Sequence, residues 1–119
     1  MSDAIVAHYR RCTFTATMKD SDGNNISVSG KTVRCKIGPD GATPLIDLTS
    51  AAATANGSTI SAANPTTIVL SSTDLVPSII QAGVWPCEFC LTDNLQNNQI
   101  VRADVARLVV HQAGTGLGV

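Results

Sequence analysis

Two stretches of this chain alternate apolar and polar side chains at every second position. In the first stretch, one side of an extended backbone would carry Cys12, Phe14, Ala16 and Met18. In the second stretch, one side would carry Val33, Cys35 and Ile37. Asp22-Gly23 lies in the polar segment between them, and its glycine supplies the positive φ that a tight turn demands. This period of two predicts antiparallel strands.

The same pattern continues along the chain and predicts eight strands with short polar joins. They fall near residues 5–18, 31–37, 44–48, 58–61, 66–70, 84–92, 99–103 and 105–111. The segment 71–83 differs, because Ser72 or Thr73 can cap a helical turn while Pro77 prevents a regular helix. We therefore expect one short helical turn near 72–80, or a loop that crosses between sheets.

Length and composition indicate a single domain with an apolar core. The chain has 119 residues, of which 44% are hydrophobic and 14% charged, with a net charge of −1. We expect one domain over residues 1–111 and a flexible, glycine-rich tail over 112–119. The strand spacing favours an all-β, two-layer antiparallel β-sandwich of about seven to eight strands over a barrel. The predicted core contains Phe14, Met18, Val33, Cys35, Ile37, Leu70, Trp85, Cys87, Phe89 and Leu91.

Charge and hydropathy exclude several classes of partner. Eight Lys and Arg against nine Asp and Glu leave no basic excess, so nucleic acid is not an expected partner. No window reaches the ~18 apolar residues of a membrane span. The first eleven residues lack the basic start and apolar stretch of a signal peptide. We expect a chain that is made in the cytoplasm and whose Ser-, Thr- and Asn-rich surface suits crowded assemblies, because charge would have to be desolvated at contacts.

Four cysteines raise the question of a metal or a disulfide. Cys87 and Cys90 form a C-x-x-C motif, but a strand over 84–92 would place their side chains on opposite faces, where they cannot both bind the same zinc ion. Cys12 and Cys35 lie on the apolar side of their strands and are expected to be small buried residues. We expect no metal and no cofactor. A pair among Cys12, Cys35 and Cys87 could still oxidise if the fold brings two of them together.

No catalytic motif accompanies the titratable residues. His8 and His111 are far apart in sequence and are expected to be isolated surface residues. Asp20, Asp22 and Asn24 imitate the opening of a calcium loop, but no glutamate closes it and a hairpin turn explains them. Trp85 is expected to be a core anchor rather than a platform for a sugar. These observations predict no enzyme activity and no catalytic residues.

The order of strand and turn segments resembles a family of phage proteins. The segments are Arg11-Cys12-Thr13-Phe14, Lys19-Asp20-Ser21-Asp22-Gly23-Asn24, Ser29-Gly30-Lys31-Thr32-Val33, Pro44-Leu45-Ile46-Asp47-Leu48, Ile68-Val69-Leu70-Ser71-Ser72-Thr73-Asp74 and Gly83-Val84-Trp85-Pro86-Cys87-Glu88-Phe89. Over residues 10–111 the chain resembles small immunoglobulin-like β-sandwich proteins of tailed bacteriophages. It is similar in particular to the amino-terminal domain of upper baseplate proteins and to related short tail or neck proteins.

The resemblance implies a non-enzymatic virion protein of the tail, baseplate or fibre-attachment region. Its partners would be other virion proteins or copies of itself, and it would act through edge strands and terminal tails. The candidate assembly contacts in the tail are Gly114, Thr115, Gly116, Leu117, Gly118 and Val119. One alternative is a capsid decoration protein. An alternative of another class is a carbohydrate-binding module for host recognition, which would need exposed aromatic side chains.

Overall fold

The computed structural model describes residues 4–20, 22–39, 41, 43–52, 54, 56–92 and 98–111. These residues form ten strands and no helix. In chain order the strands are β1 (Ala4–Ala7), β2 (Cys12–Ala16), β3 (Met18–Lys19), β4 (Thr32–Ile37), β5 (Ile46–Thr49), β6 (Thr59–Ile60), β7 (Thr66–Leu70), β8 (Gly83–Thr92), β9 (Asn98–Ala103) and β10 (Arg107–Val110). The all-β prediction is correct.

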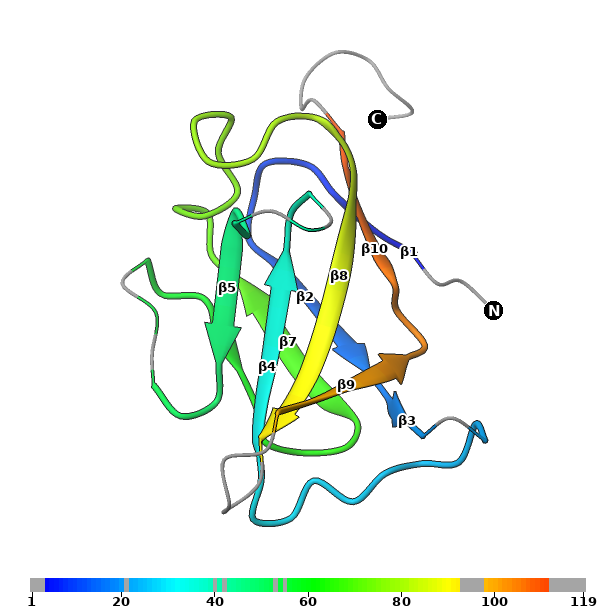
Figure 1. Ribbon diagram of the computed structural model, residues 1–119. Coiled ribbons are helices and arrows are strands. Elements are labelled where there is room, and N and C mark those ends of the chain that lie inside the picture. The colour runs from blue at the N-terminus through cyan, green and yellow to red at the C-terminus, as the bar shows by residue number, and fades with distance from the viewer. Residues whose placement is uncertain are drawn as a thin grey trace.

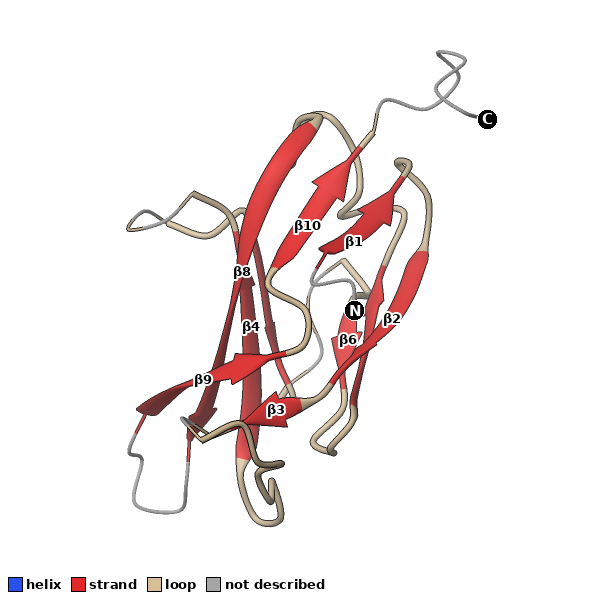
Figure 2. Cartoon of the chain, turned by 90° about the vertical axis from the view of Figure 1, so that its right-hand side faces the viewer, coloured by secondary structure: helices blue, strands red, loops and turns tan. Residues whose placement is uncertain are grey.

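The strands form two sheets that lie against each other (Figures 1 and 2). The larger sheet has the order β1-β10-β8-β4-β5, with β9 and β3 added beside the second half of β8. The smaller sheet has the order β2-β7-β6. β8 is long enough to pair with β10 over Gly83–Pro86 and with β9 over Phe89–Thr92, while β4 runs along its other side. Among these pairs β1 and β10 run parallel, and the others are antiparallel.

The single strand predicted over 5–18 is wrong, because the chain changes sheets twice within it. β1 belongs to the larger sheet and β2 to the smaller one, and the link between them includes Tyr9 at a φ of 54°. The second change falls at Thr17, whose N–H donates to Asp104 Oδ1 at 2.8 Å. β3 then pairs with β9 in the larger sheet. A period of two indicates only that one face of a strand is buried. Strands of both sheets bury one face in the same core, so the pattern does not show to which sheet a strand belongs.

The polar turn predicted at Asp22-Gly23 is formed, with Gly23 at a φ of 86°. The Asp20 carboxylate accepts the N–H groups of Asp22 and Asn24, both at 2.9 Å, so the calcium-like spacing serves a turn. After the turn, the chain pairs with β3 only through an isolated bridge between Lys19 and Asn25, and it then continues to β4. The two alternating stretches of the sequence therefore lie mainly in different sheets.

The helical turn predicted near 72–80 is not present. The segment makes two separate turns, in which Leu75 N–H donates to Ser71 O at 3.0 Å and Ile80 N–H donates to Val76 O at 2.9 Å. Pro77 lies between them and has no N–H, so the hydrogen bonds of the first turn cannot continue into the second. Leu75 and Ile80 are fully buried, which fastens this crossing loop to the core.

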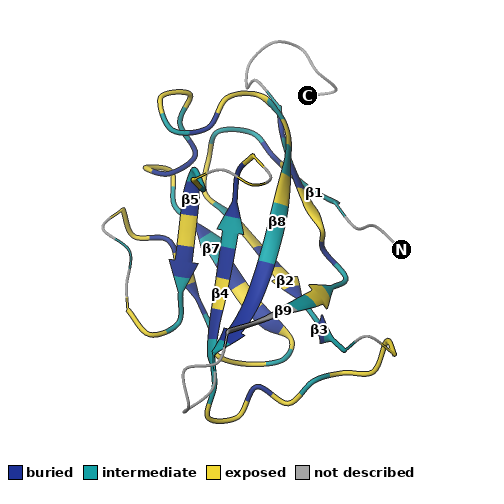
Figure 3. Cartoon of the chain, in the orientation of Figure 1, coloured by how far each residue is buried: buried dark blue, intermediate teal, exposed yellow. Residues whose placement is uncertain are grey.

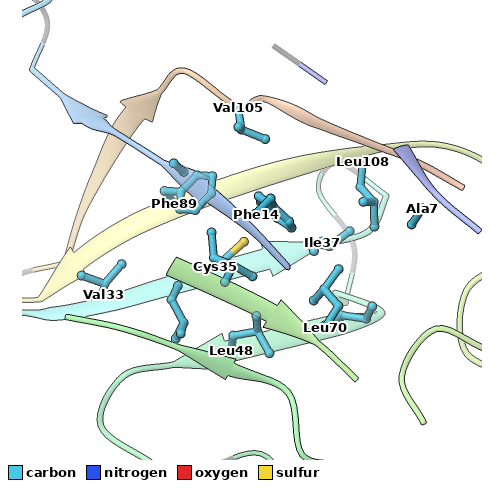
Figure 4. Close-up of a cluster of buried hydrophobic side chains, with 14 of the residues drawn as sticks. Ala7, Phe14, Val33, Cys35, Ile37, Leu48, Leu70, Phe89, Val105 and Leu108 are labelled. Atoms are coloured by element: carbon cyan, nitrogen blue, oxygen red, sulfur yellow. The ribbon is translucent and has the colours of Figure 1, made fainter. Parts of the chain in front are cut away.

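The core lies between the two sheets and is built mostly from aliphatic side chains (Figure 4). Eight of the residues predicted to be in the core are buried: Phe14, Met18, Val33, Cys35, Ile37, Leu70, Phe89 and Leu91. Trp85 and Cys87 differ from the prediction, since both are only half-buried and pack at the border of the core. The buried positions of β8 gather in its second half, whereas the residues of its first half are half-buried or exposed (Figure 3).

Candidate functional site

Three valines lie side by side on the outer face of the larger sheet. The strand register places Val6 of β1 opposite Val109 of β10, and Val109 opposite Val84 of β8. Val6 is 48% exposed and Val84 is 58% exposed, while Val109 between them is half-buried. Scattered apolar side chains are ordinary on protein surfaces, but three in register form one continuous patch. We call Val6, Val109 and Val84 the valine row.

A group of charged side chains follows the valine row on the same face. Lys36 of β4 lies between Asp47 of β5 and Glu88 of β8 in the strand register, and Arg34 lies one position further along this face. The Arg34 guanidinium donates to Asp47 through Nε at 2.8 Å and Nη2 at 2.5 Å, and this hydrogen bonding lowers the pKa of the Asp47 carboxyl. Lys36 Nζ lies 3.9 Å from Glu88 Oε1. The four charges neutralise one another on an exposed surface.

Two open hollows flank these charges. The smaller, about 190 Å³, lies between Lys36 and a group of prolines that includes Pro44 and Pro86. The larger, about 660 Å³, is lined by threonines and by the Arg34–Asp47 pair. No aromatic side chain of the described residues lines either hollow. The hollows present hydroxyl, guanidinium and carboxylate groups, but no ring that could stack on a ligand.

Both sheets end in strands with one paired neighbour. Among the described strands, β1, β5 and β3 are the outermost strands of the larger sheet, and β2 and β6 those of the smaller sheet. The outward side chains of β2 include Thr13 and Thr15, which are exposed and uncharged. Edge strands offer backbone N–H and C=O groups to another chain, and charged side chains normally discourage such pairing. β2 carries no charged side chain to prevent it.

A buried polar network lies beneath the crossing loop. The Ser58 hydroxyl donates a short hydrogen bond to the Asp74 carboxylate and accepts the Ser71 N–H at 2.9 Å. Asn56 Nδ2 donates to the other Asp74 oxygen at 2.8 Å. Ser58 is fully buried and Asp74 is 6% exposed. The hydroxyl is thus inaccessible to a substrate, and the network ties the β6–β7 hairpin to the loop after β7.

Sequence reasoning missed this network, although a signal was present. Ser71-Ser72-Thr73-Asp74 has the spacing of a capping box, and the Asp74 N–H does donate to Ser71 Oγ at 3.2 Å. The reach of Asp74 to Ser58 and Asn56 depends on tertiary packing, which the local spacing does not contain.

His8 and His111 lie together, which corrects the expectation of two isolated surface histidines. Their ring centroids are 5.5 Å apart and the ring planes differ by 20°. The parallel pairing of β1 with β10 brings them together, and His111 N–H donates to Ala7 O at 2.8 Å. His8 Nδ1 is buried and has no hydrogen-bond partner among the described residues. The nitrogen lone pairs lie in the planes of the two rings, and these planes are nearly parallel and offset, which does not favour joint ligation of one metal ion.

The fold brings Cys35 and Cys87 together on the inner side of β4 and β8. Hydrogen bonding to Cys87, followed by burial, raises the pKa of the Cys35 thiol well above its ordinary value. Cys90 lies on the opposite face of β8, where burial raises the pKa of its thiol and its Sγ donates to Glu88 Oε1 at 3.7 Å. Burial also raises the pKa of Cys12. All four cysteines are free thiols. The raised pKa values of Cys12, Cys35 and Cys90 disfavour the reactive thiolate at these three positions.

The candidate tail contacts over 114–119 lie outside the described residues. Within the described ranges, no three His, Cys, Asp or Glu side chains gather in a metal-binding arrangement. The described part of the chain also contains no helix with the length and apolar character of a membrane span. Comparison with protein-family models, curated proteins and solved structures finds no match to this chain.

Proposed function

We propose that this chain is a non-enzymatic structural component of a bacteriophage virion, located in the tail, baseplate or fibre-attachment region. The observation that carries the proposal is the valine row, which crosses β1, β10 and β8 next to an edge of the larger sheet. Burial of a half-exposed valine contributes on the order of 1 kcal/mol, so the row favours contact with another protein surface. The resemblance of residues 10–111 to phage sandwich proteins supplies the kind of particle.

We also infer that the sandwich is immunoglobulin-like. The order β1-β10-β8-β4-β5 against β2-β7-β6 supports this, because the strands of the two sheets are interleaved in sequence as in a Greek key. Such a domain presents edge strands on both sheets. Copies of the chain, or other virion proteins, would pair with these edges and cover the valine row. The candidate tail contacts at 114–119 are part of the same proposal.

A second candidate function is carbohydrate binding during host recognition. The larger hollow favours it, because threonine hydroxyls and the Arg34–Asp47 pair can hydrogen-bond to a sugar. The lack of aromatic side chains in that hollow favours the structural role instead.

A charge placed in the valine row tests the structural role. Val84→Lys should reduce the amount of the protein in purified particles of the phage that encodes it by at least tenfold, measured by quantitative mass spectrometry. Thr67→Lys is the matched control, since Thr67 is also exposed but lies on the outer face of the smaller sheet. Both variants must first show wild-type thermal unfolding.

Absence of the wild-type chain from purified particles would contradict the proposal, as would equal incorporation of Val84→Lys and wild type. Binding of the purified chain to a glycan array, lost in Arg34→Ala but kept in Val84→Lys, would instead support host recognition.

A further inference from the structure

β1 is weakly attached to its own fold. It contains four residues and pairs, among the described strands, with β10 alone. Only Ala7 among its side chains is buried, while Ile5 is half-buried and Val6 is 48% exposed. Little apolar surface therefore holds this strand in place. Most of its attachment is the four-residue parallel register with β10, which any second copy of the chain also carries.

The link after β1 contains two local costs. Tyr9 has a φ of 54°, a left-handed conformation that is unfavourable for a residue with a Cβ. Among the described residues, the buried His8 Nδ1 has no hydrogen-bond partner, which costs the free energy of its lost hydration. Both costs lie within residues 8–11, which carry the chain from the larger sheet to the smaller one. An extended link would relieve both.

We propose that β1 exchanges between two copies of this chain, so that residues 4–7 of each copy pair with β10 of the other. The exchanged strand would make the same four pairs that it makes within one chain, from Ala4 opposite Arg107 to Ala7 opposite Val110. Residues 8–11 would become extended and act as the hinge. Exchange of an identical element needs no new complementary surface, so it is a low-cost route to a dimer.

The partner in this proposal is a second copy rather than an unrelated strand, because β10 selects its neighbour by side chain as well as by backbone. Its inner face requires the small Ala7 beside the buried Val110, and its outer face aligns Val6 with Val109. The exchange would occur in solution and does not depend on the chain belonging to a virion.

A disulfide between β1 and β10 distinguishes the closed form from the exchanged one. Val6→Cys combined with Val109→Cys places two thiols opposite each other in the register and on the outer face. The full-length double variant would be refolded at about 10 μM and at about 1 mM, oxidised with oxidised glutathione, and analysed by non-reducing electrophoresis. The two single variants are the controls for links through the native cysteines.

Exchange predicts a covalent dimer that is enriched at least tenfold at the higher protein concentration and absent from both single variants. A product of monomer mass alone at both concentrations would overturn the proposal. A non-covalent dimer whose disulfides all lie within one chain would also overturn it, because that dimer would use another surface.

The hinge can be tested separately with two variants that both remove the tyrosine ring. Glycine accepts a φ of 54° and alanine does not, so Tyr9→Gly should favour the closed monomer relative to Tyr9→Ala. Each dimer opens two hinges, so the dimer Kd by sedimentation should be at least about thirtyfold higher for Tyr9→Gly. Equal dimer Kd values for the two variants would contradict the role of the hinge.

Discussion

Asp47 shows how a single exposed residue can contribute to stability in a pH-dependent way. The hydrogen bonds from Arg34 lower the pKa of Asp47 from its ordinary value of 3.8, so the folded protein holds this proton less tightly than the unfolded chain does. The contribution is therefore present above pH 3.8 and is lost as the pH falls through the lower folded value. The Arg34 side chain is 44% exposed and the Asp47 side chain 34%, so solvent screens the interaction between them.

We expect Asp47→Asn to lower the free energy of unfolding by about 0.5 kcal/mol at pH 7. The difference from wild type should shrink as the pH falls from 3.8 through the lower folded pKa, because the wild-type carboxylate is then neutralised as well. Urea unfolding at pH 7 and at pH 2.5 measures both values. Glu88→Gln is the comparison, because its 3.9 Å contact with Lys36 is looser and should contribute less. A constant difference at both pH values would show that Asp47 acts by packing instead.

Trp85 is less buried than the sequence predicts, so it is not the core anchor that we expected. The period of two correctly assigned it to the inner side of β8, but alternation cannot show how far the opposing sheet extends. The indole is half-buried and its Nε1 donates to Gln81 O at 2.8 Å. Its ring therefore covers the border of the core rather than filling the interior.

We expect Trp85→Ala to cost about 1–2 kcal/mol, clearly less than Phe89→Ala, for which full burial predicts about 3–5 kcal/mol. Urea unfolding followed by far-UV circular dichroism compares the two variants without the tryptophan signal. Equal costs would mean that the Trp85 side chain is as important to the core as that of Phe89.

At the scale of elements, the apolar pattern covered the segments that form strands but merged β1, β2 and β3 into one predicted strand over 5–18. The pattern did not predict where the chain passes from one sheet to the other, because sheet membership depends on where the backbone turns. Tyr9 and Thr17 mark the two changes of sheet, and neither is a glycine or a proline that would signal a break. Pro77, in contrast, is a local signal, and the lack of a helix beside it follows directly from its missing N–H. The candidate site was largely unpredictable, since the valine row and the histidine pair require the register of β1 with β10.

The Ser58–Asp74 network is the element-scale feature with the clearest energetic consequence. We expect Asp74→Ala to cost about 2–3 kcal/mol, because it leaves the buried Ser58 hydroxyl and the Asn56 amide without their acceptor. In a double-mutant cycle, Ser58→Ala and Asp74→Ala should show a coupling of at least about 1 kcal/mol. Ser72→Ala, in the exposed part of the same loop, should stay within about 0.5 kcal/mol of wild type. Additive effects of the two substitutions would contradict a shared network.

At the scale of the whole molecule, one core joins the two sheets. Leu48 of the larger sheet and Ile68 of the smaller one belong to the same buried cluster, and the crossing loop adds Leu75 and Ile80 to it. Because the described core side chains of both sheets belong to this one cluster, separation of the sheets exposes both inner faces at once. The valine row lies on the outer face of the larger sheet.

This shared core predicts cooperative unfolding of the two sheets. Leu48→Ala and Ile68→Ala should each cost about 2–5 kcal/mol, although they lie in different sheets. Trp85 fluorescence reports on one end of the larger sheet, and far-UV circular dichroism reports on the strands of both. For the wild type and for each variant the two signals should give the same urea midpoint, as expected for a single domain of this size. A circular dichroism transition that precedes the fluorescence transition in Ile68→Ala would mean that the smaller sheet unfolds alone. In that case the core would be divided, and the larger sheet with its valine row would be a stable unit by itself.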